Sequence, residues 1–153
     1  MYHTCLIYGI PIENLPFGYD EKDELCTKMK LKIAQLVSEL AVSGTTNYVT
    51  DCEFGVPLWG AEIVLAQKIY NPQITLTVYM PHEEQAVKWA SDWRDRYFSV
   101  HENADKVVTL KDYDICIDEL CNGTDVLIYA GENSTEVLER FYRDNKTVHR
   151  INF

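Results

Sequence analysis

Strand-like and helix-like segments alternate along the whole chain, and this alternation limits the possible folds more than any other feature. Six short runs are rich in apolar and β-branched residues, as strands are, at 4–8, 47–52, 74–79, 106–110, 125–129 and 147–151. The segments between them carry apolar residues at helical spacing, at 21–43, 58–70, 83–97, 113–121 and 134–144. Strands joined through helices pair in parallel with right-handed crossovers. We therefore expect a single-domain Rossmann-like three-layer α/β/α sandwich over residues 1–153, with a mainly parallel sheet of five or six strands.

Charge and length narrow the classes of function. The 153 residues fit one domain, and the net charge of -10 disfavours binding to nucleic acid, which needs clustered lysine and arginine. No apolar run approaches the roughly 18 residues that a membrane span requires. The N-terminus has the pattern of a first strand and not of an export signal. These features predict a cytoplasmic protein with no membrane segment.

Cysteine and histidine are poorly placed for metal or disulfide chemistry. The five cysteines are odd in number, irregularly spaced and without a Cys-x-x-Cys pair, which indicates free thiols. Cys52 lies at a strand end, but its acidic neighbours favour an inert thiol. The four histidines are scattered, so no metal site is expected, and no sequence motif indicates a bound cofactor.

The loop between the second strand and the second helix is the most informative part of the sequence. In open parallel sheets ligands bind beyond the carboxyl ends of the strands, where the strand order reverses. Gly55, just before a helix, lets the backbone approach a ligand, and the helix start offers N–H groups to an anion. A strand-to-helix turn also needs a glycine for purely structural reasons, so the loop alone does not establish a site.

The same loop resembles the YpsA-like branch of the SLOG superfamily, which is related to the LOG and DprA proteins. That branch reads Ser-Gly-x-x-x-Gly-x-Asp/Glu-Leu-Trp-Ala-Ala-Glu, and the matching residues here are Gly55, Leu58, Trp59, Ala61 and Glu62. Further stretches agree in order, at 7–9, 79–89, 103–108 and 123–128. The resemblance implies a Rossmann-like fold and a nucleotide or nucleotide-derived ligand. LOG-type members cleave the N-glycosidic bond of nucleoside monophosphates, whereas others bind nucleotides or single-stranded DNA.

Several positions depart from the branch pattern in ways that weaken a phosphate site. Asp51 stands where the branch has its first glycine, and a carboxylate there repels phosphate. After the fifth strand, the branch's Gly-Gly-Thr is replaced by a segment that begins at Gly131 and carries Glu132. Leu138 occupies the position of the LOG-type glutamate. These departures predict a partly degenerate phosphate site.

Three functions remain open. The first is a binding domain for a nucleotide or sugar phosphate, with a crevice formed by Tyr8, Gly9, Asp51, Gly55, Trp59, Glu62, Pro81, Gly131, Ser134 and Thr135. The second is a hydrolase that cleaves an N-glycosidic bond, with Glu62 and Asp51 as its acid and base in one cavity. The third is a protein-interaction scaffold with an exposed patch of Trp93, Tyr97 and Phe98, and a homodimer is compatible with such a domain.

Two of these residues also have simple structural interpretations. Glu62 would bond a ribose hydroxyl or act as a base, or it would make only local contacts on its helix. Trp59 would stack on a base, or it would belong to the hydrophobic core.

Overall fold

The computed structural model describes residues 3–153 and contains one six-stranded sheet in which every neighbouring pair is parallel. The strands are β1 (Thr4–Gly9), β2 (Asn47–Thr50), β3 (Thr75–Met80), β4 (Lys106–Thr109), β5 (Val126–Ala130) and β6 (Thr147–Ile151). Their order across the sheet is β4-β3-β2-β1-β5-β6. The predicted Rossmann-like α/β fold is confirmed.

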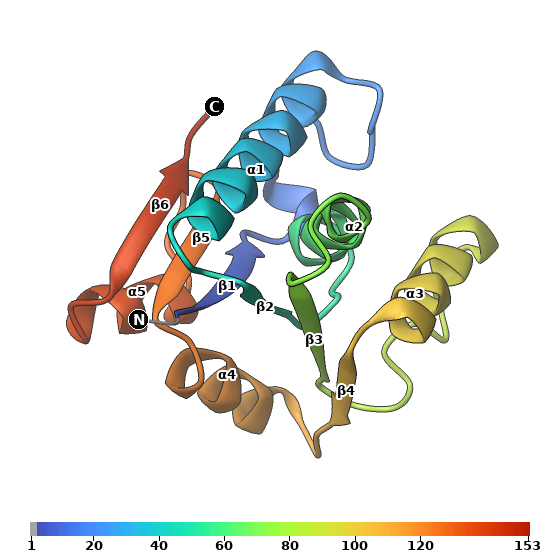
Figure 1. Ribbon diagram of the computed structural model, residues 1–153. Helices are drawn as coiled ribbons and strands as arrows, with labels where there is room; N and C mark the ends of the chain where they lie inside the picture. The colour runs from blue at the N-terminus through green and yellow to red at the C-terminus, as the bar shows by residue number, and fades with distance from the viewer. Residues whose placement is uncertain (1–2) are drawn as a thin grey trace.

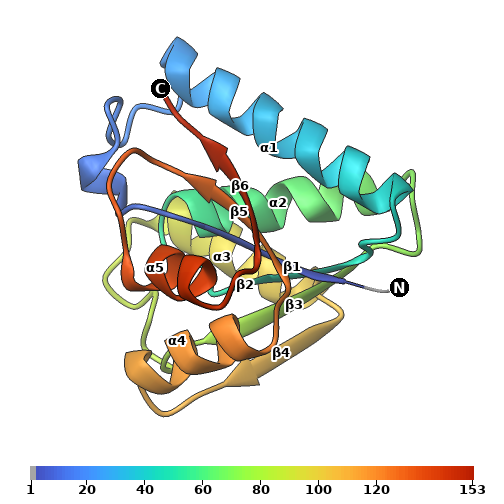
Figure 2. The same cartoon turned by 90° about the vertical axis from the view of Figure 1, so that its left-hand side faces the viewer.

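Helices cover both faces of this sheet (Figures 1 and 2). They are α1 (Glu24–Val42), α2 (Val56–Lys68), α3 (Ser91–Asn103), α4 (Tyr113–Asn122) and α5 (Glu136–Arg143), with a short 3-10 helix η1 (Ile12–Asn14) after β1. The first two lie against one face and α4 and α5 against the other, while α3 packs beside α2. Asp23, Asp112 and Thr135 cap α1, α4 and α5, because their side chains accept backbone N–H groups of the first turn.

The strand order reverses beside β1. The chain runs outward from β1 to β4 and then returns through α4 to β5, which pairs with β1 on its other side. The carboxyl ends of β1 and β5 therefore meet at the reversal, where ligands bind in folds of this kind. The loops after β1, β2 and β3 lie along the same edge of the sheet.

The core follows from the pattern of the sequence. All five residues of β5 are buried, as expected for a strand covered on both faces. On α2, Gly60 packs directly on Ile7 of β1, where a Cβ atom would lie only 2.5 Å from the Ile7 side chain. This close approach places the start of α2 against the centre of the sheet. No helix within residues 3–153 is long and apolar enough to span a membrane.

The third helix differs from the sequence-based prediction. The apolar stripe predicted a helix at 83–97, but residues 83–88 form turns and α3 extends over Ser91–Asn103. Ala90 has an extended backbone (ψ 150°) that interrupts a continuous helix. Tyr97 and Val100 form the buried side of α3, and Trp89 lies before the first residue of the helix. The buried Tyr97 also removes the centre of the predicted exposed patch, in which only Phe98 is mostly exposed.

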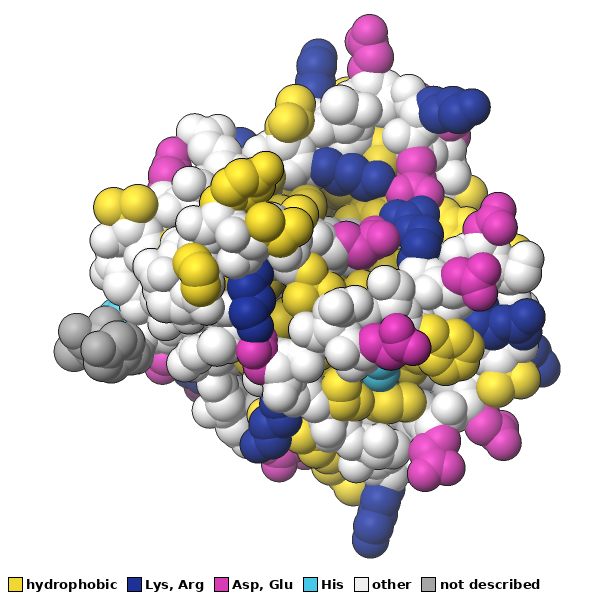
Figure 3. All heavy atoms as spheres, turned by 45° about the vertical axis from the view of Figure 1, so that its right-hand side comes forward, with side chains coloured by type: hydrophobic (Ala, Val, Ile, Leu, Met, Phe, Trp, Pro, Cys, Tyr) yellow, Lys and Arg dark blue, Asp and Glu magenta, His cyan; other side chains and the backbone are white. Residues whose placement is uncertain are grey.

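The surface around α3 carries mixed charge. Figure 3 shows acidic and basic side chains interspersed on the side of the molecule that includes this helix. The view shows no continuous basic surface that would attract a polyanion.

Candidate functional site

The loop after β2 has a fixed shape that its own side chains impose. The Thr50 hydroxyl donates to the carbonyl of Pro57 (3.0 Å) and accepts the N–H of Cys52 (2.7 Å). Cys52 has a left-handed backbone (φ 55°), and Gly55 begins α2 with φ 112°, a value that favours glycine. The loop therefore turns sharply and directs residues 53 and 54 away from the sheet.

The glycines predicted to admit a phosphate instead face side chains of the loop after β1. A Cβ atom on Gly131 (φ 133°) would lie 2.7 Å from Ile10, and one on Gly55 would lie 3.1 Å from Ile12. Both isoleucines are buried. Gly9 lies in the same region, and a Cβ atom there would meet the Ala130 carbonyl oxygen at 2.6 Å. The space beside the reversal of strand order is thus filled by apolar atoms of the chain itself.

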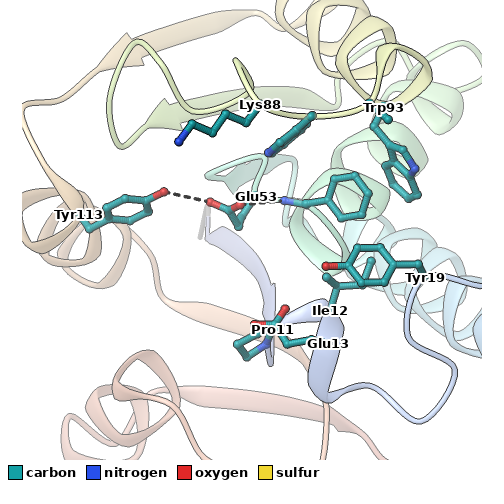
Figure 4. A pocket seen from close by; sticks show the side chains of 11 residues that line it. Pro11, Ile12, Glu13, Tyr19, Glu53, Lys88, Trp93 and Tyr113 are labelled. Atoms are coloured by element: carbon teal, nitrogen blue, oxygen red, sulfur yellow. Dashed lines mark hydrogen bonds between the residues drawn. The ribbon is translucent and has the colours of Figure 1, made fainter.

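A cavity of about 670 Å³ opens next to this filled region, above the ends of β1 and β2. Figure 4 shows the side chains around it. The lining residues are Pro11, Ile12, Glu13, Tyr19, Glu53, Phe54, Lys88, Trp89, Ala90, Trp93 and Tyr113. They come from the loop after β1, the loop after β2, the segment before α3, α3 itself and the start of α4. We call this space the aromatic cavity.

The aromatic side chains of this cavity pack on one another. The Phe54 ring centre lies 3.7 Å from that of Trp93, 5.2 Å from that of Trp89 and 5.4 Å from that of Tyr19. Tyr19 is 61% exposed, so its ring is accessible at the mouth of the cavity. This group forms a broad aromatic wall.

Polar groups lie on the opposite side from Trp93 and Tyr19 (Figure 4). The Glu53 carboxylate accepts from the Tyr113 hydroxyl (3.4 Å), from the Gln85 amide (3.2 Å) and from the backbone N–H of Phe54 (3.3 Å). Burial, followed by the negative charge of Glu53, raises the pKa of Tyr113 to about 12, so its hydroxyl stays protonated at neutral pH. Lys88 supplies a positive charge to the same cavity.

Gln85 fixes the segment before α3 to the β2 loop. Its side-chain amide also donates to the backbone carbonyl of Asp51 (2.9 Å), and its carbonyl oxygen accepts the Tyr97 hydroxyl (2.9 Å). The residue is almost fully buried. This explains the glutamine in the 79–89 stretch: it holds two walls of the cavity together.

Asp51, predicted as a catalytic acid or base, lies behind Glu53. It is 4% exposed, and one carboxylate oxygen accepts the Glu53 N–H (3.0 Å). Burial, helped by the charge of Glu53, raises the pKa of Asp51 to about 7. A carboxyl group with this pKa exchanges protons near neutral pH, as a general acid or base must.

Glu62, the second predicted catalytic residue, belongs to an ionic network on the other side of α2. Its two oxygens accept from Arg96 at 2.9 and 2.6 Å, and Arg96 also bonds both oxygens of Glu21 (2.7 and 3.0 Å). Lys30 adds a further ion pair to Glu21 (2.7 Å). Glu62 lines a separate hollow between α2 and α3, so it and Asp51 do not share the aromatic cavity.

The other predicted site residues are spread over the same edge of the sheet. Trp59 is 1% exposed and packs near Phe17 and Trp93, with its ring N–H buried without a partner in the described part of the chain. Tyr8 is half-buried, and burial raises the pKa of its hydroxyl. Pro81 is buried after β3, and neither it nor Tyr8 lines the aromatic cavity.

Ser134 and Thr135 lie at the start of α5. Ser134 is exposed, and the Thr135 hydroxyl accepts the N–H of Leu138 (3.4 Å) as a helix cap. Neither residue belongs to the aromatic cavity.

Most residues of the aromatic cavity were not among the sequence-based candidates. Tyr19, Glu53, Phe54, Lys88 and Tyr113 come from four different segments, and none is a matching residue of the resemblance: Glu53 and Phe54 stand at unspecified positions of the Gly55 motif, and Lys88 lies within the 79–89 stretch. The sequence signal that could have located the cavity was the 79–89 stretch with its buried glutamine, because that stretch forms one wall of the cavity.

Comparison with known proteins supports the resemblance. The sequence profile of YpsA, a SLOG family, matches residues 6–140. The UPF0398 protein BH1768 of Halalkalibacterium halodurans is 32% identical over 90 residues, which cover 58% of this chain and 48% of that protein. A UPF0398 protein of Bacillus cereus is 34% identical over 108 residues, 68% of this chain and 56% of its own length. The matches span about half the length of these curated relatives, whose names state no activity.

Proposed function

Since the chain belongs to the YpsA SLOG family, we propose that it binds a nucleoside or nucleotide-derived ligand in the aromatic cavity. The observation that carries this proposal is the combination of an aromatic wall and an opposing polar side at the carboxyl ends of β1 and β2. Ligands of Rossmann-like folds bind at this edge of the sheet.

The size and the wall of the cavity suit a nucleobase. Small-molecule sites enclose roughly 300–1,000 Å³, and the cavity of about 670 Å³ lies within that range. A base that stacks on aromatic side chains gains roughly 1–3 kcal/mol. The rings of Tyr19, Phe54 and Trp89 offer surfaces for such stacking.

The charges near the cavity favour a ligand with few phosphates. Glu13 and Glu53 line it and Asp51 lies behind it, whereas Lys88 is its one lining cation within residues 3–153. The buried Ile10 and Ile12 pack against Gly131 and Gly55, and the Gly131 N–H already donates to the Ile151 carbonyl (3.0 Å), so it is not free to bind a phosphate. A nucleoside or a monophosphate fits this balance better than a triphosphate or single-stranded DNA.

Thermal unfolding in the presence of nucleosides and nucleoside monophosphates tests this proposal. A ligand at about 100 times its dissociation constant adds about 2.7 kcal/mol to the stability, which is a shift of several degrees for a domain of this size. Tyr19→Ala should weaken binding, since this exposed ring lines the cavity. Tyr142→Ala, a similarly exposed tyrosine on α5, is the matched control. No shift with any compound would reject the proposal and favour a protein-interaction scaffold.

One observation favours a second candidate, hydrolysis of the N-glycosidic bond of the bound ligand. Asp51, whose pKa burial raises to about 7, lies directly behind Glu53 and does not itself line the cavity, so it would act on the ligand without direct contact. Release of free base from a bound nucleotide, lost in Asp51→Asn without loss of binding, would support this activity. Binding with no release of base over hours would exclude it.

A further inference from the structure

Glu53 presents a carboxylate to the aromatic cavity that its neighbours satisfy only weakly. Its three hydrogen bonds, from Gln85, Tyr113 and the Phe54 N–H, all have donor–acceptor distances of 3.2 Å or more. Strong hydrogen bonds to a carboxylate are shorter, at about 2.7–2.9 Å. Within residues 3–153, no lysine, arginine or histidine nitrogen lies within 4.0 Å of it. The group therefore keeps the capacity to accept further hydrogen bonds.

The position of this carboxylate is fixed before any ligand arrives. Gln85 is buried and is itself held by Tyr97 and by the backbone of Asp51. Tyr113 approaches from the start of α4 on the other side (Figure 4). The Glu53 carboxylate, held from two sides next to the aromatic wall, can accept hydrogen bonds from the edge of a ring that stacks on that wall.

The chemistry of an ionised carboxylate determines which ring edge it accepts. It has acceptors only, so it bonds best to a group with two adjacent donors. Guanine has such an edge, because its ring N1–H lies next to its exocyclic amino group. Adenine and cytosine place an acceptor beside the amino group, and uracil flanks its single N–H with two carbonyls. We propose that Glu53 selects a guanine base in the aromatic cavity, an inference that rests on the proposed nucleoside binding.

The surrounding groups agree with this choice. The Tyr113 hydroxyl remains protonated and donates to the Glu53 carboxylate, so it helps to hold this acceptor at the edge of the cavity. Lys88 lines the same cavity and is exposed, in a position to meet the guanine carbonyl or a ribose-linked phosphate. The cavity thus offers guanine a hydrogen-bond acceptor, Glu53, and a cation, Lys88, from two separate segments of the chain.

Isothermal titration of the full chain with guanosine, inosine and adenosine tests the inference. A two-point contact to a base edge discriminates against the wrong base by about 10- to 100-fold. We expect guanosine to bind that much more tightly than adenosine, with inosine between them because it keeps N1–H and lacks the amino group. Equal affinity for guanosine and adenosine would overturn the inference and leave nucleoside binding intact. Binding of none of the three would overturn both.

Two variants locate the selectivity. Glu53→Gln keeps the size of the side chain but replaces one acceptor by a donor, so guanosine should lose its advantage, while adenosine, whose edge pairs a donor with an acceptor, should bind as tightly as before or more tightly. Tyr113→Phe removes only the hydroxyl that holds the carboxylate, and a smaller loss for guanosine alone is expected. Glu139→Gln, at an exposed position on α5, is the control. Unchanged selectivity in both cavity variants would show that Glu53 does not read the base.

Discussion

Replacement of Asp51 by asparagine is expected to change how the stability of the protein depends on pH. The folded chain holds this carboxyl group with a pKa of about 7, against an ordinary value of 3.8, chiefly because the group is buried. Between these two values the folded state keeps a proton that the unfolded state has released. The stability contributed by this group is therefore largest at low pH and falls as the pH rises.

The size of the effect follows from the two pKa values. Linkage gives a loss of about 1.4 kcal/mol per pH unit between them. From pH 5 to pH 8 this amounts to about 2.5 kcal/mol, since the loss levels off above the folded pKa. Asparagine cannot ionise, and its side-chain oxygen can still accept the Glu53 N–H. Asp51→Asn should therefore gain about 2.5 kcal/mol relative to wild type over this range.

Urea unfolding of both proteins at pH 5, 6, 7 and 8 measures this difference, because the titration of groups that do not interact with Asp51 cancels in the comparison. Asp95→Asn on the exposed side of α3 is the control, and its curve should stay parallel to wild type. Parallel curves for Asp51→Asn would show that Asp51 carries the same charge in the folded and unfolded states throughout this range, as an ionised carboxylate would, and the reasoning from burial would be refuted.

Three further predictions concern stability and reactivity. Gly131→Ala should lower the free energy of unfolding, measured in urea, by at least about 1–3 kcal/mol, because the added Cβ atom meets a side chain at 2.7 Å and φ is 133°. Gly18→Ala is the control: φ is 55° and no atom lies within 4 Å of the added Cβ, so the loss should be only about 1 kcal/mol. Arg96→Gln should lower the free energy of unfolding by about 1–3 kcal/mol, because it leaves the carboxylates of Glu21 and Glu62 without their shared partner. Arg143→Gln, with 69% of the side chain exposed, should change it by no more than about 0.5 kcal/mol. Equal effects of the two substitutions would refute a stabilising role of the Arg96 network. All five cysteines are buried, so a thiol reagent should react slowly with the native protein and fully in urea; rapid labelling without denaturant would contradict this burial.

The sheet and most helices could be predicted from sequence because their signals are local. The β-branched run at 74–79 and the fully apolar run at 126–130 identify strands on their own composition. The third helix could not be placed correctly, because Gln85 is held in a turn by the distant Tyr97 and by the backbone of Asp51. A contact that forms only in the folded chain thereby replaced the helix that residues 83–89 favour locally.

The candidate site was harder to predict for the same reason. The resemblance indicated the edge of the sheet at which the aromatic cavity also lies, but it could not show that Ile10 and Ile12 fill the space beside the two glycines. Glu62 matched the family motif, yet its partner Arg96 lies 34 residues further along the chain. Glu53 had no motif of its own, and its proposed role depends on the aromatic wall that the loops assemble.

The ionic network of Arg96 has a consequence for binding thermodynamics. Through Glu21 it ties the end of the loop after β1 to α3, and that loop supplies Ile12 and Tyr19 to the cavity. Fixing the backbone of one residue costs about 1–2 kcal/mol of conformational entropy. For the loop after β1 this cost is met when the chain folds, so it does not reduce the free energy of binding. A ligand of the proposed kind would therefore meet a preorganised wall, so its association should be fast and its heat-capacity change small, without the signature of coupled folding.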